Sequence, residues 1–427
     1  MPPDVRPVRP SLPAGWTTGT IENLFAPLED ERTLHQGWSP QCEKEPSPSE
    51  DVWGVLKTTA IQAGEFQPEH NKQLPDKLTP RPLIEVKEGD ILITCAGPRA
   101  RCGVACLVRR TRKRLMMSGK MYRFRVDPKR HDARYVEAFL QTEQARQAID
   151  KMKTGGSDSG LNLTHDRFRQ LPVPVAPLAE QRRIVSEIEK QFTRLEAGVA
   201  ALRRVQANLH RYRAAVLKAA CEGPWKRLSV SEIGKAVTGS TPSTKDPGNF
   251  GGDVPFFKPT DLNAGYYVRE AREHLTAQGA KLARQLPERA VLVTCIGATI
   301  GKTGLARVAC ATNQQINALV VDRRVAIPEW AFWCFVSPDG QKQIKENASA
   351  TTLPILNKSR FENLELPLPP LAEQERIVAE VERRLSVVSE LAEVVEANLT
   401  RATRLRQSIL QQAFDGRLVR QNQGGAA

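Results

Sequence analysis

The chain has 427 residues, which is enough for two or three domains, each able to bury a hydrophobic core. Its hydrophobic content of 40% and charged content of 26% are ordinary for a globular protein, and no apolar run reaches the roughly eighteen residues of a membrane-spanning helix. The net charge of +14 indicates a polyanionic partner, although a basic protein without such a partner stays open. No signal peptide opens the chain, so the expected location is the reducing cytoplasm.

The N-terminal part of the chain predicts a disordered segment followed by a globular unit. Residues 1–13 contain five prolines and should be disordered. The first globular unit is predicted over residues 14–170, with a mobile loop at residues 39–50. Its apolar run Ile91–Cys95 is typical of a buried strand, and a helical stretch is expected near residues 132–151.

Positive charge is concentrated in the first globular unit. Between Arg99 and Arg134 there are thirteen Lys and Arg residues and only two acids, Asp127 and Asp132. The densest part of this stretch is residues 109–114. Contact with phosphate groups is the favoured interpretation, and a solvated hairpin is the alternative.

A thirteen-residue phrase occurs twice, at residues 177–189 and 370–382, with ten identical positions and a constant offset of 193. The first copy opens a long helix that follows Pro177 and stops at Gly223, within a central helical segment over residues 171–223. The chain is therefore predicted to be a duplication in which one domain and one long helix are used twice.

A second globular unit is predicted over residues 224–363. Its apolar run Val291–Cys295 aligns with the strand of the first unit, and a helical stretch is expected near residues 328–346. Apolar β-branched runs bounded by Gly and Pro, mixed with helices, indicate an α+β fold for each unit.

The second long helix is predicted within residues 364–416, followed by a tail at residues 417–427. In both helices apolar residues recur at steps of three and four, which is the pattern of a coiled-coil seam. The seam positions are 185, 188, 192, 195, 199, 202, 209 and 216, and 378, 381, 385, 388, 392, 395, 399, 402, 409 and 413. A pseudo-two-fold axis between the halves would make the pair antiparallel and about 65 Å long. A parallel pair, pairing between two chains, and two amphipathic helices packed on their own domains stay open.

Two segments of the second unit resemble functional motifs. Gly297–Thr303 looks like a nucleotide-binding P-loop, but it has three residues between its glycines where four are needed, and a strand-like run follows. A hairpin tip that presents Lys302 and Thr303 is the favoured interpretation, with an NTPase as the alternative. The amides of Asn313–Gln315 can pair with an adenine edge or can close a strand turn.

Catalytic and metal-binding patterns are not indicated. The six histidines are scattered, and the eight cysteines lack the spacing of a zinc site. Four cysteines stand among apolar residues, as free core thiols do, namely Cys95, Cys295, Cys310 and Cys334. We therefore expect neither a catalytic residue nor a metal ion in this chain.

The two Pro-Leu-x-Glu-Gln-x-x-Ile-Val segments, each opening a long helix after a globular unit, resemble the specificity subunit of type I restriction-modification systems. The resemblance runs from about Trp16 to Gly416, and the hairpin Gly297–Gly304 and the segment Asn313–Gln315 of the second half are also typical of it. The first half departs at the aligned positions, with Pro98–Arg101 in place of the hairpin tip and Ser118–Lys120 in place of the amides.

The resemblance implies two tandem α/β target recognition domains joined by an antiparallel coiled coil, in a pseudo-two-fold internal repeat. Each domain would read one half of an asymmetric bipartite target in double-stranded DNA, and the coiled coil would set the spacer. The chain would not be an enzyme. It would bind two methyltransferase (modification) subunits and restriction or translocase subunits, which would hold S-adenosylmethionine, ATP and Mg. A modification complex without restriction subunits, and a coiled-coil scaffold that does not bind DNA, stay open as alternatives.

Two sets of site residues are predicted on this basis. The DNA-binding residues are Lys57, Arg99, Arg101, Lys120 and Arg123 in the first unit, and Lys258, Lys302, Thr303, Asn313 and Gln314 in the second. The partner-binding residues are Glu180, Gln181, Arg183, Glu373, Gln374 and Arg376, all within the repeated phrase.

Overall fold

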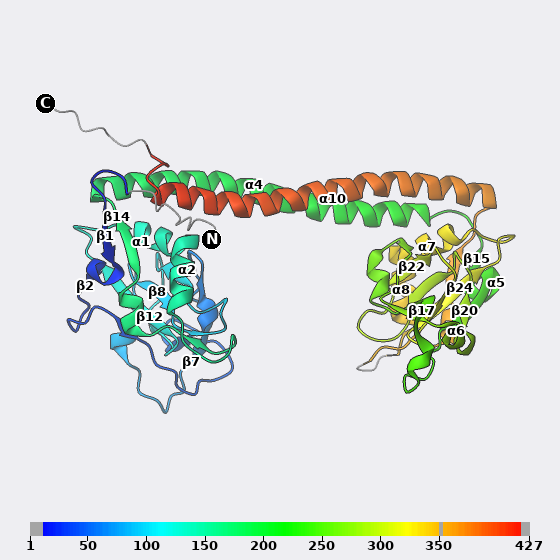
Figure 1. The fold of residues 1–427 in the computed structure, drawn as a ribbon, viewed down its shortest axis with the longest axis horizontal. Coiled ribbons are helices and arrows are strands. Elements are labelled where there is room, and N and C mark those ends of the chain that lie inside the picture. The colour runs from blue at the N-terminus through cyan, green and yellow to red at the C-terminus, as the bar shows by residue number, and fades with distance from the viewer. Residues whose placement is uncertain (1–11, 350–352, 420–427) are drawn as a thin grey trace, which may run out of the picture. The chain divides into compact units, whose positions relative to one another are not determined.

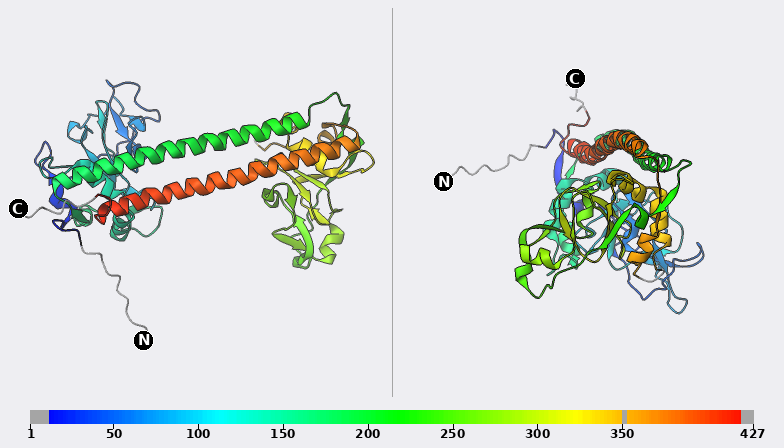
Figure 2. Two further views of the ribbon diagram at one scale, coloured as in Figure 1. Left: turned by 90° about the horizontal axis from the view of Figure 1, so that it is seen from above. Right: turned by 90° about the vertical axis from the view of Figure 1, so that its right-hand side faces the viewer.

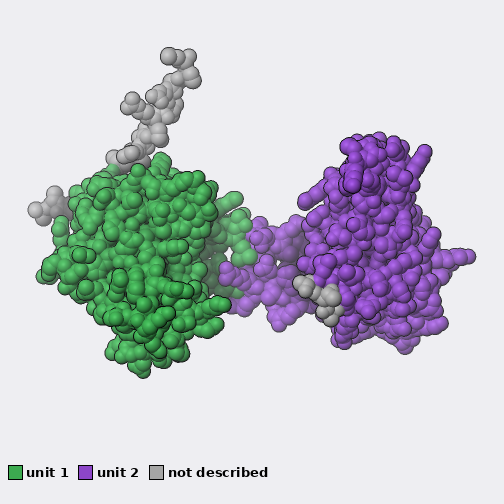
Figure 3. All heavy atoms as spheres, turned by 90° about the horizontal axis from the view of Figure 1, so that it is seen from below, with its two compact units in different colours: residues 1–201, 398–427 green, residues 202–397 purple. Residues whose placement is uncertain are grey.

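The computed structural model describes residues 12–349 and 353–419, so the expected disorder of residues 1–13 falls almost wholly outside the described part. The chain divides into two compact units, drawn in different colours in Figure 3. Unit 1 comprises residues 1–201 and 398–427, and unit 2 comprises residues 202–397. Each unit contains one globular domain and a part of each of two long helices.

The domain of unit 1 combines a five-stranded sheet, a three-stranded sheet and several two-stranded pairs with short α-helices. The larger sheet has the order β10 (Ala105–Leu107), β8 (Ile91–Thr94), β12 (Met121–Val126) and β2 (Phe25–Ala26), and β3 (His35–Gln36) also pairs with β12. The smaller sheet has the order β11 (Leu115–Met116), β4 (Gly54–Leu56) and β7 (Asn71–Gln73). Two-stranded pairs are β1 (Thr17–Thr20) with β14 (Pro172–Val175), β5 (Ile61–Gln62) with β6 (Glu65–Phe66), and β9 (Ala96–Gly97) with β13 (Leu161–Asn162). The helices are α1 (Ala133–Leu140), α2 (Glu143–Met152) and α3 (His165–Arg169).

The domain of unit 2 is built in a similar way (Figure 1). One sheet has the order β16 (Gly234–Thr238), β24 (Ile316–Val321), β21 (Val291–Thr294), β22 (Thr303–Ala306) and β18 (Tyr267–Val268). The other has the order β19 (Glu273–Leu275), β17 (Phe250–Phe257), β23 (Cys310–Thr312) and β20 (Gln285–Leu286), and β15 (Arg227–Ser229) pairs with β25 (Glu365–Pro367). The helices are α5 (Val230–Ile233), α6 (Ala277–Leu282), α7 (Pro328–Val336), α8 (Pro338–Glu346) and α9 (Lys358–Glu362).

The two domains share a central pair of strands, which confirms the α+β prediction. β8 pairs antiparallel with β12 in unit 1, and β21 pairs antiparallel with β24 in unit 2. Every residue of β8 and β21 is buried, as expected of continuous apolar runs that are covered on both faces. The helical stretches predicted near residues 132–151 and 328–346 are α1 with α2 and α7 with α8.

The two long helices carry the repeated phrase. α4 spans Leu178–Ala220 and has 43 residues, and α10 spans Leu371–Phe414 and has 44 residues. Each begins directly after a proline, Pro177 or Pro370, because the fixed φ of proline suits the start of a helix. The helix boundaries therefore fall close to those predicted from the sequence.

α4 and α10 pack on each other in opposite directions, and Figures 1 and 2 show them side by side. In unit 1, the start of α4 shares one hydrophobic core with the end of α10, through Ile184, Val185 and Ile188 with Ile409, Leu410, Ala413 and Phe414. In unit 2, the end of α4 shares a core with the start of α10, through Val216 and Leu217 with Ile377, Val378, Val381, Leu385 and Val388. The predicted antiparallel coiled coil is therefore confirmed.

The predicted seam is buried toward the ends of the helices and less buried between them. Val185 and Val378 are buried, Leu202 is half-buried, and Ala392 is exposed. The buried seam residues also belong to the cores of the two domains. The helices therefore pack both on each other and on the domains. The alternative in which the helices pack on their own domains is correct for their buried ends.

The cysteines behave as core thiols. All eight are free, and the four that were expected in apolar surroundings are buried. Within residues 12–349 and 353–419, no group of three or more His, Cys, Asp or Glu side chains is arranged to hold a metal ion. No helix in this part of the chain is long and apolar enough to cross a membrane.

Candidate nucleic-acid interface and helix joints

The glycine-rich segment of unit 2 connects two strands. β22 follows directly after Lys302 and pairs antiparallel with β21, whereas a P-loop would lead into a helix at this point. Gly297 and Gly301 have φ angles of +94° and +86°, which favour glycine and permit a tight connection. The predicted hairpin is therefore present, and the nucleotide-binding alternative is not supported.

The hairpin holds Lys302 and Thr303 in different surroundings. Lys302 is half-buried, and its Nζ donates to Asn263 Oδ1 at 2.6 Å and to the Pro259 carbonyl at 3.3 Å. Thr303 is only 7% exposed, and its hydroxyl donates to the Gly301 carbonyl at 3.0 Å. Thr303 thus lies inside the domain, which does not fit its predicted contact with DNA.

The amide cluster forms the turn between β23 and β24. Asn313 is 7% exposed, its Nδ2 donates to Gln315 Oε1 at 2.9 Å, and its Oδ1 accepts from the Gln315 backbone N–H at 3.2 Å. Asn313 therefore closes the turn and does not present a free edge. Gln314 is exposed, and its Oε1 accepts from the Thr241 hydroxyl at 2.6 Å. Thr241 was not predicted, because it lies 73 residues from its partner in the sequence.

Several predicted residues of unit 2 gather at one edge of the domain. The Asn313 backbone N–H donates to the Phe257 carbonyl at 3.2 Å, which places the turn beside Lys258. Lys302 reaches Pro259, the next residue along. We call this the loop edge of unit 2, and it consists of residues 258–263, 297–302 and 313–315.

The cations of this loop edge already have internal partners. Lys258 forms an ion pair with Glu273 across 2.5 Å, and both side chains are partly exposed. An exposed ion pair contributes little to stability and opens at small cost when a phosphate competes for the cation. Ammonium and amide groups of this kind donate hydrogen bonds to phosphate oxygens and base edges. The loop edge therefore presents groups whose chemistry suits contact with an anion.

The corresponding connection in unit 1, between β9 and β10, contains Arg99 and Arg101. Arg101 donates to the carbonyl oxygens of Thr58 and, at 2.7 Å, of Ile61. It therefore braces the segment after β4, as Lys302 braces the segment after β17. The two domains hold this connection with a cation although the sequences of the two connections differ.

The other predicted cations of unit 1, apart from Arg123, lie nearby. Arg99 pairs with Asp150 at 3.2 Å and Asp158 at 2.9 Å, and its hydrogen bond to Asp158 raises the pKa of the guanidinium. Lys57 is half-buried next to the segment that Arg101 braces. Lys120 is exposed, and its carbonyl accepts from the backbone N–H of the residue that follows β8, at 2.9 Å. These residues form the loop edge of unit 1.

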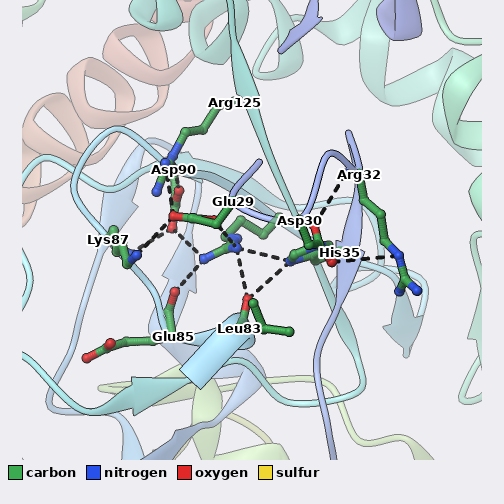
Figure 4. Close-up of polar contacts among 10 residues, drawn as sticks. Glu29, Asp30, Arg32, His35, Leu83, Glu85, Lys87, Asp90 and Arg125 are labelled. Carbon is green, nitrogen blue, oxygen red and sulfur yellow. Dashed lines mark hydrogen bonds and ion pairs between the residues drawn. The ribbon is translucent and has the colours of Figure 1, made fainter. Parts of the chain in front are cut away.

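Arg123 does not lie on that edge. Its residue is 0% exposed, and its guanidinium donates to the Leu83 carbonyl at 3.0 Å, to the Glu85 carbonyl and to His35 Nδ1 at 3.0 Å. It also pairs with Asp90, which is buried as well, at 3.5 Å. Figure 4 labels the residues with which it interacts, namely Glu29, His35, Leu83, Glu85 and Asp90. The prediction that Arg123 contacts DNA is wrong, because a buried guanidinium with internal partners cannot reach a phosphate.

Two carboxylates belong to this network, the buried Asp90 and the partly exposed Glu29. Burial raises the pKa of Asp90, although Arg123 and Arg125 oppose this effect. Burial would also raise the pKa of Glu29, but its bond from Lys87 and the two guanidinium groups lower this pKa to about 2. Glu29 is therefore ionised throughout the neutral range and holds an exposed lysine against the domain.

Two residues of the run 109–114 support the fold. Arg109 forms an ion pair with Glu137, whose side chain is buried, across 2.5 Å. Arg112 donates to the carbonyl of Ser49 at 3.2 Å and so holds the loop predicted to be mobile. The favoured phosphate interpretation of this run is therefore weakened, because part of its charge is used inside the domain.

Gln181 and Gln374 occupy the same position in the two copies of the repeated phrase, and both are 0% exposed. Oε1 of Gln181 accepts from the Asp132 backbone N–H at 2.9 Å, and Oε1 of Gln374 accepts from the Ile327 backbone N–H at 2.9 Å. Nε2 of each also donates to the carbonyl directly before its helix proline, Ala176 at 2.7 Å or Pro369 at 2.8 Å. Each glutamine therefore joins a long helix to the domain of its own unit.

These contacts correct two predictions of partner binding. Gln181 and Gln374 have no exposed surface, so neither presents itself to another subunit. Among the remaining residues of the phrase, Glu373 and Arg376 form an exposed ion pair at 2.7 Å, Arg183 is exposed, and Glu180 is half-buried. Their predicted role in partner binding stays a prediction.

Comparison with known proteins gives a family match and several relatives. Residues 222–397 match the family model described as the type I restriction modification DNA specificity domain. The specificity subunit of the EcoEI type I restriction enzyme from Escherichia coli is 41% identical over 181 residues, which are 42% of this chain and 30% of that protein. The HindI specificity subunit from Haemophilus influenzae is 29% identical over 170 residues, 38% of this chain and 36% of that protein. These two alignments therefore span about a third of each relative.

Two comparisons cover nearly the whole chain. The EcoKI specificity subunit from Escherichia coli K12 is 22% identical across 96% of this chain and 90% of that protein. A solved structure from a study of assembly and conformational transition of the type I restriction-modification system covers 95% of this chain and 99% of that chain, with a TM-score of 0.76 and 20% identity. The HsdS subunit from Thermoanaerobacter tengcongensis covers 95% and 98%, with a TM-score of 0.55 and 19% identity. At these identities, the structural likenesses show the fold.

Proposed function

We propose that this chain, a member of the family of type I restriction-modification DNA specificity subunits, selects the DNA sequence on which a modification complex acts. Each domain is, on this proposal, a target recognition domain that reads one half of an asymmetric bipartite site. The observation that carries the proposal is the repeated contact of Gln181 and Gln374, each of which joins a long helix to a domain. We call each of these contacts a joint. Equivalent glutamine contacts hold two domains whose loop edges present different residues.

The loop edges supply the chemistry of the proposed DNA contact. In unit 2 the edge presents Lys258, Lys302 and the exposed amide of Gln314. In unit 1 the aligned turn presents Lys120. Lysine contacts with phosphate position a protein on DNA, whereas amide contacts with base edges discriminate between sequences. Two edges that differ at equivalent positions favour an asymmetric target over a palindrome.

The coiled coil would set the distance between the two half-sites. A helix of 44 residues spans about 65 Å. This length exceeds the roughly 34 Å that separates half-sites one turn of DNA apart. Exposed apolar side chains such as Val205, Val387 and Leu391 offer an additional face on the helices for the two methyltransferase subunits.

The chemical steps are assigned to the partners in this proposal. This chain would not be an enzyme, and the methyltransferase subunits would bind S-adenosylmethionine and transfer the methyl group. Restriction or translocase subunits would use ATP and Mg. The basic charge of the specificity subunit would then serve to bring the complex to DNA, because electrostatic contacts supply most of the non-specific affinity.

The direct test is a comparison of adenine methylation across the genome of the source cells with and without this gene. We expect one bipartite, asymmetric motif to lose methylation on deletion and to regain it when the gene is supplied in trans. If the partner methyltransferase is active and the methylated motifs do not change, the specificity role is wrong. The scaffold alternative would then be the better account.

A further inference from the structure

We infer that Gln181 and Gln374 are positioning residues that fix the spacer of the recognised DNA site by locking each domain on its long helix. This inference rests on the proposed function. In this inference the repeated glutamines hold the two recognition domains in place. Their position in the repeated phrase had instead suggested that they contact a partner subunit.

Each glutamine ties together three segments that are separate in the chain. One is the long helix that carries it, and the second is the segment just before that helix. The third is the turn that leads into α1 or α7, where Nε2 also lies 3.5 Å from the Arg130 carbonyl and 3.3 Å from the Val325 carbonyl. Both joints use the same donor and acceptor atoms, so the arrangement is repeated at atomic detail in the two units.

A second contact accompanies each glutamine. In unit 1 the Tyr135 hydroxyl donates to the Pro174 carbonyl at 2.9 Å, and in unit 2 the Trp330 indole N–H donates to the Pro367 carbonyl at 2.9 Å. The two prolines are 193 positions apart, like the two glutamines. Each joint therefore has two fixed points, which resist rotation of the domain about the helix better than one point would.

A third contact differs between the units. Glu189 of α4 pairs with Arg134 of α1 at 3.4 Å, whereas the equivalent Glu382 of α10 accepts from the Tyr266 hydroxyl at 2.5 Å. The partner of this glutamate has changed while the partners of the glutamine remain backbone atoms. Because a backbone contact does not depend on the side chains of a domain, it can hold domains of different sequence at one angle.

A small change of angle at the joint is large on the scale of DNA. A domain of about 150 residues has a radius of gyration of about 15 Å and a diameter of about 40 Å, so its far surface lies about 40 Å from the helix. A tilt of about 5° moves that surface by about 3.5 Å, close to the 3.4 Å rise of one base pair. Loosening one joint should therefore admit spacers that are one base pair shorter or longer.

The experiment is methylome sequencing of cells that produce the full chain with its methyltransferase partner, comparing wild type with Gln374→Ala. Truncation leaves a buried N–H and two buried carbonyl groups without their partner, which weakens the joint. We expect unchanged half-site sequences and about a tenfold rise in methylation at sites whose spacer differs by one base pair. Gln181→Ala tests the other joint independently. Glu375→Ala is the matched control, because Glu375 is the exposed neighbour on the same turn.

Gln374→Glu provides a second, isosteric variant if the alanine variant folds poorly. It keeps one acceptor oxygen but places a carboxylate oxygen, which cannot donate a hydrogen bond, opposite the Pro369 carbonyl. The contact is therefore lost, and we expect the same relaxed spacer. Strict wild-type spacing in Gln181→Ala and in a folded Gln374 variant would overturn the inference. Loss of methyltransferase binding with an unchanged melting temperature would overturn it in favour of a docking role. A wild-type methylome without a bipartite motif would instead refute the proposed function.

Discussion

Cys221 and Cys334 lie with their sulfur atoms 3.9 Å apart, where the end of α4 meets α7 in unit 2. The equivalent position in unit 1 holds Phe414 and Phe139, whose rings meet edge to face with centroids 5.4 Å apart. The two contacts serve the same purpose, because each fastens the end of a long helix to a domain. Unit 2 has two thiols where unit 1 has an aromatic pair, and two thiols can react with each other.

We predict that mild oxidation converts this pair into a disulfide. The hydrogen bond with Cys334 lowers the pKa of Cys221, whereas burial raises the pKa of Cys334, so Cys221 is the thiol that reacts first. With diamide as the oxidant, the two thiols lose two protons and two electrons, the S–S bond forms, and diamide is reduced to its hydrazine. A non-reducing peptide map should show the linked peptides, which Cys221→Ser should abolish. Recovery of both thiols while Cys42 is oxidised would contradict the prediction.

Replacement of Arg123 should destabilise unit 1. Arg123→Ala leaves Asp90 buried with one cation fewer, and removal of one partner from a buried ion pair costs about 3 kcal/mol. Urea denaturation of the full chain should show this loss in one transition. Lys120→Ala is the control, because Lys120 is exposed on the same unit and should change the free energy of unfolding by less than about 0.5 kcal/mol. Wild-type stability combined with weaker DNA binding in Arg123→Ala would restore the original prediction of a DNA contact.

Arg123 also shows where sequence reasoning failed. It lies in β12, where all residues except Arg125 are buried. From the sequence alone, an arginine in this strand indicates either that the strand is exposed at that position or that the guanidinium has a buried partner. The partner is Asp90, which is 33 positions away, together with Glu29 from a distant loop. No local pattern predicts such pairing, because it depends on how β8 and β12 meet. In contrast, helix limits and strand identity follow from local periodicity and proline, and these predictions were confirmed.

Gln181 was misassigned for a different reason. A polar residue repeated in two copies of a phrase suggests a shared partner, but it serves equally well as a shared internal contact. The sequence did contain a signal, because Gln181 lies three and four positions before the buried residues Ile184 and Val185. It therefore stands on the apolar face of the helix, where a polar side chain needs an internal hydrogen-bond partner.

The charge of Glu29 should make unit 1 sensitive to acid. The folded-state pKa of Glu29 is lowered from 4.5 to about 2, so its contribution to stability is present above pH 4.5 and is lost as the pH falls toward 2. Glu29→Gln removes this contribution. The difference in melting temperature between wild type and variant should therefore shrink as the pH is lowered through this range. A difference that stays constant between neutral pH and about pH 2.5 would show that the carboxylate charge is not responsible.

Lys302→Ala should weaken DNA binding at all sequences to a similar degree. Loss of one phosphate contact lowers the slope of log K against log salt concentration by about one. Filter binding or anisotropy over a range of salt concentrations measures this slope. Lys342→Ala is the control, because Lys342 is an exposed lysine of α8 that pairs with Glu346. An unchanged slope in Lys302→Ala would show that the hairpin does not contact the phosphate backbone.

Lengthening the coiled coil should change the spacer of the target. Insertion of four residues after Ala201 in α4 and after Ala397 in α10 adds about 6 Å to each helix and places both insertions at the boundary of the two units. At 3.4 Å per base pair, the methylated motif should keep both half-sites and gain one or two base pairs of spacer. Insertion into α4 alone is the control, because it shifts the seam of one helix against the other and should abolish modification. If the double insertion modifies a site of unchanged length, the helices do not set the spacing, and the domains must reach their half-sites by another route.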